Sequence, residues 1–184
     1  MKTLKNHCLI SAPHMTDALF EKSVVYICEH NKDGAMGLII NKSLSQIKLD
    51  GLLKINDNLS FMLKSANKKT FLGGPVLIEN IIILHTNDIV TENAIAITNK
   101  ISISSDKTIL KKISDANNLK YKIFLGHSGW IGGQLETEIE NGDWLIQKSS
   151  IDLIFGMPKE TIWEHATRSL GIEINDISSF GGSA

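Results

Sequence analysis

The chain has 184 residues, of which 42% are hydrophobic, and its formal net charge is −1. This size and composition predict one soluble globular domain over residues 1–184 with a full hydrophobic core. The near-neutral charge gives no support to a basic nucleic-acid surface. No apolar run approaches the roughly 20 residues of a membrane helix, and no signal peptide is recognised at the N-terminus, so we expect a cytoplasmic protein without membrane association.

Short runs rich in isoleucine and valine predict β-strands along the whole chain. In chain order the expected strands are Ser23–Cys28, Gly37–Ile40, Thr70–Leu72, Ile81–His85, Ile95–Ile97, Ile101–Ser104, Tyr121–Leu125 and Trp144–Gln147. The run from Val24 to Cys28 is apolar on both faces, so it should lie in the centre of the sheet.

Helical patterns are fewer than strand patterns. Apolar residues at helical spacing predict helices over Ser105–Ser114, Gly133–Asn141 and Pro158–Leu170, with weaker patterns for short helices at Thr16–Glu21 and Gln46–Lys54. Strands dominate the first half and do not alternate regularly with helices, which favours an α+β fold over a doubly wound sheet. We expect polar surface connections at 56–69 and 87–93 and a mobile tail at 178–184.

The two cysteines, Cys8 and Cys28, lie inside apolar segments. Free cysteines are most often buried, and in the cytosol they stay reduced, so we expect that role here. A disulfide between them stays open, because the sequence does not give their separation in space.

The segment Gly126-His127-Ser128-Gly129 lies between an expected strand and an expected helix. This position invites comparison with the nucleophile elbow of serine hydrolases, which needs a glycine two residues after the serine. Trp130 stands there instead and argues against a Ser128 nucleophile. Two interpretations remain: a glycine-rich turn that brings the strand close to the helix, and free N–H groups at the helix start that bind an anion or carboxylate.

Cys28-Glu29-His30 could supply metal ligands or an acid–base pair. Alternation along a strand places Cys28 and His30 on one face and Glu29 on the other. Two ligands are too few for zinc, and no H-x-x-x-H or C-x-x-C spacing is present, so we predict no metal site. Asn41, at the end of the following strand, is interpreted as a turn residue or as a ligand donor.

Two further glycine segments, Gly34–Gly37 and Gly73–Val76, lack the spacing of phosphate-binding loops. We interpret them first as tight turns or bulges at which backbone segments approach each other closely.

Trp130 and Trp144 flank the expected helix that contains Gln134. They either pack in the core or form a platform for a planar ligand. The nearby acids Glu136, Glu138 and Asp143 are interpreted as a solvated face, because Glu136 and Glu138 do not face each other on a helix.

Taken together, these segments resemble the YqgE/AlgH family, a bacterial group with no settled biochemical activity, over nearly the whole chain. The segments that carry the resemblance are Ser23–His30, Gly34–Gly37, Asn41-Lys42, Gly73–Val76, Gly129-Trp130, Gly133–Glu136, Glu138-Ile139 and Gly142–Leu145. The resemblance implies an α+β fold whose strongly curved, bifurcated, mostly antiparallel sheet forms a partial barrel with helices packed outside. It also implies a link to transcriptional regulation, but no DNA-binding motif and no reaction.

The chain departs from the family pattern near its N-terminus and around the glycine segments. Asp17-Ala18 stands for Asp-Pro, Ser43 for Pro, His127-Ser128 for Tyr-Ala and Ile131-Gly132 for Gly-Pro. If typical members have alanine where Ser128 stands, a serine mechanism is not the family's chemistry. The change at Ile131-Gly132 alters the rim of this segment.

We predict a non-catalytic protein that binds a small molecule or a protein partner, with transcriptional regulation as one form of that role. The binding groove would lie where three glycine-bearing bends meet at one rim of the sheet. The candidate residues are Glu29, His30, Asn41, Gly73, Gly74, Gly129, Trp130 and Gln134.

Two other hypotheses are kept beside this one. The alternative is an enzyme of unknown reaction, such as a hydrolase that uses Glu29 and His30 as acid and base. Direct nucleic-acid contact is a third hypothesis, which the near-neutral charge does not favour. No cofactor is predicted.

Overall fold

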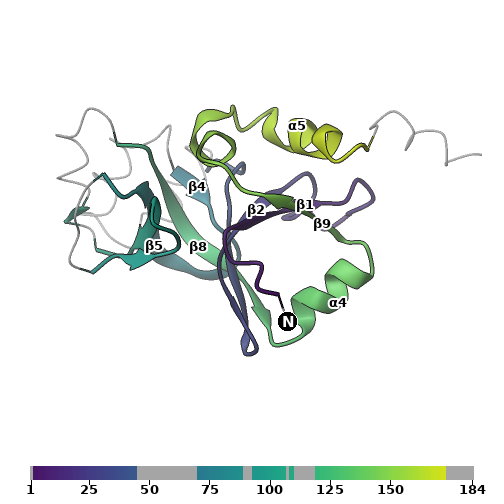
Figure 1. Ribbon diagram of the computed structural model, residues 1–184, viewed down its shortest axis with the longest axis horizontal. Helices are drawn as coiled ribbons and strands as arrows, with labels where there is room; N and C mark the ends of the chain where they lie inside the picture. The colour runs from purple at the N-terminus through teal and green to yellow at the C-terminus, as the bar shows by residue number, and fades with distance from the viewer. Residues whose placement is uncertain (1, 45–69, 89–92, 107, 110–118, 173–184) are drawn as a thin grey trace, which may run out of the picture.

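The computed structural model describes residues 2–44, 70–88, 93–106, 108–109 and 119–172 (Figure 1). The expected helix at Gln46–Lys54, most of the one at Ser105–Ser114, the connection at 56–69 and the tail at 178–184 lie outside these residues. Within the described part, no helix has the length and apolar character needed to cross a membrane.

The described strands form one sheet in the order β6-β7-β5-β8-β3-β2-β1-β9, and β4 pairs with β8 off this path. Their bounds are β1 His7–Ser11, β2 Val24–Asn31, β3 Gly34–Ile39, β4 Thr70–Leu72, β5 Val76–Thr86, β6 Ile95–Ala96, β7 Ile101–Ser104, β8 Tyr121–Ile131 and β9 Trp144–Lys148. These pairings are antiparallel except that of β4 with β8. The described helical elements are α4 (Gln134–Glu140), the short π-helix η2 (Asp152–Gly156) and α5 (Ile162–Ser169).

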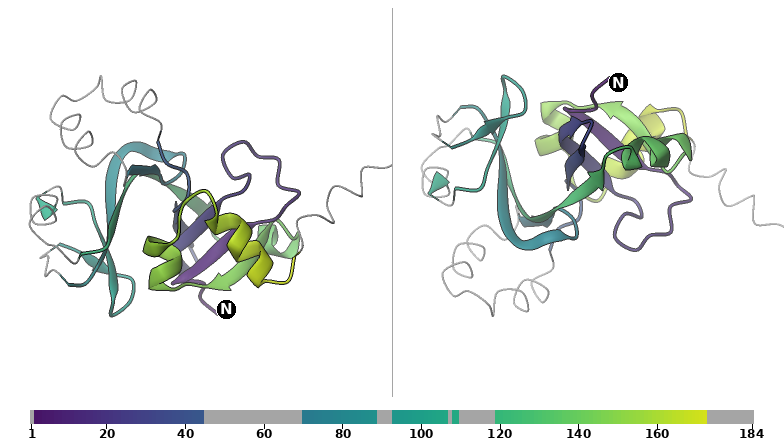
Figure 2. Two further views of the ribbon diagram at one scale, coloured as in Figure 1. Left: turned by 90° about the horizontal axis from the view of Figure 1, so that it is seen from above. Right: turned by 90° about the horizontal axis from the view of Figure 1, so that it is seen from below.

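The sheet divides at β8. The first half of β8 pairs with β5 on one edge and with β4 on the other, where Thr70–Leu72 lie opposite Ile123–Leu125. Its second half pairs with β3, where Gly34–Gly37 lie opposite Ser128–Ile131. The two branches curl around a shared apolar cluster and form a half-barrel (Figure 2). The predicted α+β fold with a curved, bifurcated and mostly antiparallel sheet is confirmed.

The helices α4 and α5 cover opposite faces of the branch that contains β1 (Figure 1). Side chains alternate along β1, so Ile10 packs in one cluster with Trp163 of α5, and Leu9 packs in another with Leu135 of α4. In β2, the run Val24–Cys28 is buried at every position. The prediction that this run lies inside the sheet is therefore confirmed.

Both cysteines are free thiols in the core, as expected. Burial raises the pKa of Cys8 to about 12 and also raises the pKa of Cys28. A buried thiol with a raised pKa has little thiolate to react, so the two side chains act as small apolar residues.

Several boundaries differ from the prediction. The strand β1 was not expected, because its apolar run is very short. The expected helix at Thr16–Glu21 is wrong: this segment forms a single turn, in which the Asp17 carboxylate accepts the N–H groups of Leu19 and Phe20. The helix α5 begins at Ile162, because the residues from Pro158 onward form a turn before it.

The strand β8 continues through Gly126–Gly129, so the interpretation of this segment as a glycine-rich turn is wrong. Gly126 has a φ of +66°, a conformation that glycine adopts without strain. Next to it, the pairing of β8 with β5 shifts register between Val76 and Ile81, as at a β-bulge. Gly73 lies against the same point, and a Cβ there would be 2.2 Å from the Gly126 carbonyl oxygen. These glycines bring backbones into contact, as the first interpretation of the Gly73 segment expected.

We expect Gly73→Ala to lower the free energy of unfolding by at least about 2 kcal/mol, because the added methyl group meets backbone that cannot turn aside. The matched control is Gly129→Ala, whose Cβ finds nothing nearer than Val76 Cγ2 at 3.6 Å. Chemical denaturation of both variants measures the difference. Equal stability of the two variants would contradict the close approach at Gly73.

Among the residues that the structure describes, one lysine side chain lies inside the half-barrel. Lys122 of β8 is buried, and its Nζ donates to the carbonyl oxygen of Ile40 at 2.9 Å and lies 4.6 Å from the centroid of the Phe71 ring. Burial lowers the pKa of Lys122 from 10.5 to about 8, against a smaller opposite effect of Cys8.

This burial predicts a pH-dependent stability. Between about pH 8 and pH 10.5, the unfolded chain keeps the Lys122 proton that the folded chain has lost, so raising the pH favours folding. We expect the unfolding free energy of the wild type to rise by roughly 2 kcal/mol relative to that of Lys122→Met between neutral pH and about pH 10. Denaturation of both proteins at each pH measures this, and a difference that does not change with pH would contradict it.

Candidate functional site

An open groove of about 480 Å³ lies at the end of β8, between this strand, α4 and the loop that joins β1 to β2. Gly129 and Trp130 of β8 and Gln134 of α4 line it, so the structure brings three of the predicted site residues together. The loop closes the other side with residues that include Asp17 and Phe20. We call this space the aromatic groove.

Glu138 of α4 organises the aromatic groove. Its Oε2 accepts the indole N–H of Trp130 at 2.7 Å and that of Trp144 at 2.8 Å. Its Oε1 accepts an N–H from the side chain of Gln134 at 2.9 Å, since residues four apart share one face of a helix. Gln134 in turn accepts the backbone N–H of Ile131 at 3.2 Å. One carboxylate therefore ties together β8, α4 and the start of β9.

Aromatic side chains form the floor of the aromatic groove. Trp130 and Trp144 meet edge to face with their ring centroids 6.1 Å apart, and Phe20 meets Trp144 in the same way at 5.6 Å. Trp130 is 7% exposed and Trp144 is 3% exposed, so packing fixes both rings. The floor is rigid and apolar.

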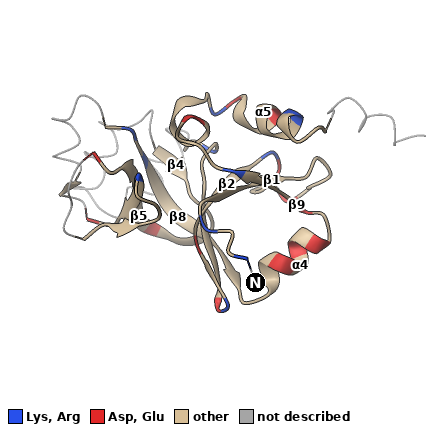
Figure 3. Cartoon of the chain, in the orientation of Figure 1, with Lys and Arg blue, Asp and Glu red and all other residues tan. Residues whose placement is uncertain are grey.

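The rim of the aromatic groove is acidic. Asp17, Glu138 and Asp143 line it, and its described lining contains no lysine or arginine. Asp17 accepts two backbone N–H groups of its own loop, and His14 Nε2 lies 3.9 Å from Asp143 Oδ1. Figure 3 shows further acidic residues along α4. The hydrogen-bond donors to Asp17 and Glu138 are neutral N–H groups, so no positive charge of the protein offsets these carboxylates, and the rim favours a cation.

Glu29 and His30 do not form the acid–base pair considered from the sequence. Glu29 is exposed, and its Oε1 accepts the Asn31 side-chain N–H at 3.1 Å. His30 is buried, with its Nε2 2.8 Å from Glu136 Oε1. Its Nδ1 accepts the backbone N–H of Leu4 at 2.9 Å, so Nε2 carries the proton and donates to Glu136. Both ring nitrogens of His30 are occupied without Glu29.

The His30–Glu136 contact has a structural consequence. It ties the N-terminal segment, which also donates from Thr3 Oγ1 to the His30 carbonyl oxygen at 3.0 Å, to the first turn of α4. The pKa of Glu136 is lowered, first by a hydrogen bond from its own backbone N–H and then, against an opposing effect of burial, by His30.

The remaining predicted residues lie away from the aromatic groove. Asn41 joins two segments, because its Oδ1 accepts the Val24 N–H at 2.9 Å and its Nδ2 donates to the Lys22 carbonyl oxygen at 2.8 Å. Gly73 and Gly74 are buried against β8. The residue after them, Pro75, is exposed and lines the aromatic groove.

A serine nucleophile and a metal site were also considered from the sequence. Ser128 is fully buried, and its Oγ donates to the Gly73 carbonyl oxygen at 3.1 Å, which agrees with the argument against a serine nucleophile. Across the described ranges, no three His, Cys, Asp or Glu side chains gather closely enough to hold a metal ion.

Sequence reasoning missed Glu138, Asp143 and the loop residues Asp17 and Phe20. The solvated-face interpretation is wrong for Glu138, whose carboxylate turns toward the indoles. The exposed acid at the end of this helix is Glu140. The four-residue spacing of Gln134 and Glu138, next to Trp130, is the signal that could have found this face of α4. No comparable signal in the sequence marks the loop.

Residues 8–175 match the family model described as DUF179, AlgH-like. A UPF0301 protein of Marinomonas sp. strain MWYL1 is 39% identical over 180 residues, which cover 96% of this chain and 94% of that protein. A UPF0301 protein of Shewanella denitrificans is 36% identical over 183 residues, with 99% of each chain covered.

Two solved structures are similar to this chain. The solution structure of the AlgH protein from Pseudomonas aeruginosa has a TM-score of 0.72 and 30% identity, with 100% of both chains covered. A crystal structure of a Corynebacterium diphtheriae protein has a TM-score of 0.72 at 19% identity, with 95% of this chain and 91% of that one covered, and shares the fold.

The hydrogen bonds of Glu138 predict the effect of removing it. We expect Glu138→Ala to lower the free energy of unfolding by about 2 kcal/mol, because two buried indole N–H groups lose their acceptor. Glu140→Ala is the matched control, since Glu140 lies in the same helix and is exposed. Urea denaturation measures both variants. A loss no larger in Glu138→Ala than in Glu140→Ala would contradict the role of this carboxylate.

Proposed function

We propose that this chain, which belongs to the AlgH-like family, is a non-catalytic binding protein whose aromatic groove holds a positively charged group of its ligand or partner. The observation that carries the proposal is the Glu138 carboxylate. It accepts three N–H groups from neutral donors, and no lysine or arginine stands beside it in the described lining of the groove. Its negative charge is therefore fixed in place and available to a cation.

The apolar floor and the acidic rim together favour one class of ligand. A lysine or arginine side chain, like a small alkylammonium compound, combines an apolar stem with a charged head. The stem would lie over Phe20 and the indoles, and the head would lie near the carboxylates of Glu138 and Asp143. A volume of about 480 Å³ suits a single side chain of a partner or a small molecule.

The polar groups of the aromatic groove favour binding over catalysis. The side chains of Glu138 and Gln134 are engaged by neighbouring donors and acceptors. His14 and Asp143 form the one His–carboxylate pair of the described lining, but they are 3.9 Å apart, beyond the contact range of an acid–base couple. A role in transcriptional regulation would act through the bound partner.

The test is an NMR titration with butylguanidinium and with butylurea, its neutral counterpart. The chain has three tryptophans, and the indole N–H of each gives its own signal. We expect butylguanidinium to shift the signals of Trp130 and Trp144 in a saturable way and to leave Trp163 unmoved. Trp163 is an internal control, because its N–H donates to the Ser11 carbonyl oxygen at 2.9 Å on the α5 side of the sheet.

Variants that replace a carboxylate by an amide of similar shape test whether binding depends on the negative charge. Glu138→Gln combined with Asp143→Asn should weaken butylguanidinium binding by roughly tenfold, equal to about 1.4 kcal/mol, whereas Glu140→Gln should not change it. Titration of a capped Gly-Arg-Gly peptide distinguishes a protein partner from a small cation. Equal shifts with butylurea, or no saturable shift with any of these probes, would reject the proposal.

A further inference from the structure

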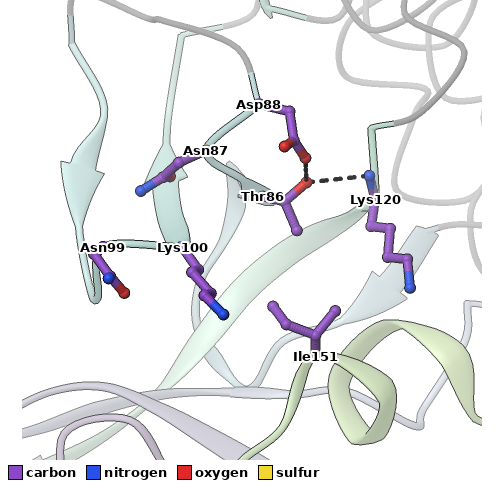
Figure 4. A pocket seen from close by; sticks show the side chains of 7 residues that line it. All are labelled: Thr86, Asn87, Asp88, Asn99, Lys100, Lys120 and Ile151. Carbon is purple, nitrogen blue, oxygen red and sulfur yellow. Dashed lines mark hydrogen bonds between the residues drawn. The ribbon is translucent and has the colours of Figure 1, made fainter.

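A second groove, of about 360 Å³, lies at the other end of β8, where the β5–β7 part of the sheet meets the segment before η2 (Figure 4). Its described lining comes from the end of β5, the turn before β7, the start of β8 and Ile151. Lys120 directly precedes β8 and is ten residues before Trp130 of the aromatic groove, which corresponds to a path of about 30 Å along the extended chain. We call this second space the lysine groove.

The lysine groove carries two unpaired positive charges. Lys100 and Lys120 line it, and in Figure 4 their side chains lie on either side of Ile151. Across the described ranges, neither ammonium group has an ion pair or a hydrogen bond. The one acidic residue in the described lining, Asp88, accepts the hydroxyl hydrogen of Thr86 at 2.6 Å instead. The balance of charge in this groove is therefore positive.

Backbone hydrogen bonds hold both lysines in place. Thr86 donates its backbone N–H to the Lys120 carbonyl oxygen at 3.0 Å, and Lys120 donates its own N–H to Thr86 Oγ1 at 3.3 Å. Asn87 donates its backbone N–H to the Lys100 carbonyl oxygen at 2.9 Å. The two ammonium groups thus extend from fixed points, and only side-chain freedom is lost when an anion binds between them.

Neutral donors and a third lysine complete the surroundings. The side-chain amides of Asn87 and Asn99 line the same groove and can donate to an anionic oxygen. Lys122 of β8 is two residues after Lys120, so its side chain points to the same side of the chain, and it is buried in the core. Its charge adds to the positive potential behind the groove.

We propose that the lysine groove binds the phosphate group of a small phosphorylated compound. Ammonium groups act as point charges toward phosphate, and two of them with two amide donors match a dianion that has three acceptor oxygens. The volume leaves space for a body about the size of a sugar beside the phosphate. The site is independent of the aromatic groove in place and in charge.

The probes are ribose 5-phosphate, inorganic phosphate and neutral ribose, titrated into the full chain and followed by backbone NMR signals. We expect saturable shifts centred on Asn87 and Lys100 with ribose 5-phosphate, smaller or equal shifts with inorganic phosphate, and none with ribose. Lys100→Gln and Lys120→Gln should each weaken binding about threefold to tenfold, and the double variant more than either. Lys32→Gln, at the exposed β2–β3 turn, is the matched control and should bind like the wild type.

Several outcomes would overturn this inference. One is the absence of saturable binding to both phosphate probes; another is binding that Lys100→Gln and Lys120→Gln reduce no more than Lys32→Gln does. A short single-stranded oligonucleotide that binds with a steep salt dependence, while ribose 5-phosphate does not bind, would assign the groove to nucleic acid and reject the small-molecule proposal. Unchanged amide spectra of the free variants show that the substitutions have left the fold intact.

Discussion

The fold depends on one constraint: strand β8 must accept three neighbouring strands along a single run of eleven residues. A strand has only two edges, so two of the three neighbours must use the same edge of β8. Along that edge β4 pairs first and β3 pairs with the residues that follow. At the change of partner, the backbones of Gly73, Gly74 and Gly126 come so close that no Cβ would fit between them. The bifurcation and the half-barrel follow from this contact, because the sheet has to bend where its edge changes partner.

This constraint also determines which residues come together at the two ends of β8. At one end the strand turns into α4, so Trp130 and Gln134 project into the same space and Glu138 joins them from the next helical turn. At the other end the strand begins beside the end of β5, where Lys120 contacts Thr86, and Lys100 in the turn before β7 lines the same groove. Both grooves are therefore built from segments far apart in sequence that β8 holds together.

The sequence predicted the strands and the curved sheet better than it predicted the residues of the aromatic groove. Alternation and β-propensity located the central run Val24–Cys28, because burial on both faces leaves a continuous apolar pattern. The Gly126–Gly129 segment was expected as a turn, since local propensity cannot show that a bulged strand passes through a glycine at a positive φ. Glu138 was assigned to solvent, because a hydrogen bond to Trp144 depends on the path of the chain between them.

The two grooves differ in what keeps their charged side chains from forming ion pairs within the protein. In the aromatic groove the carboxylate of Glu138 is surrounded by neutral N–H donors, which stabilise the charge without cancelling it. In the lysine groove, the Asp88 carboxylate that could pair with a lysine is turned to the Thr86 hydroxyl. The path along β8 between the two grooves is about 30 Å, longer than the screening length of about 8 Å at physiological ionic strength, so salt weakens the electrostatic interaction between them. The backbone of β8, with its bulge at Gly126, is the element that connects the two ends.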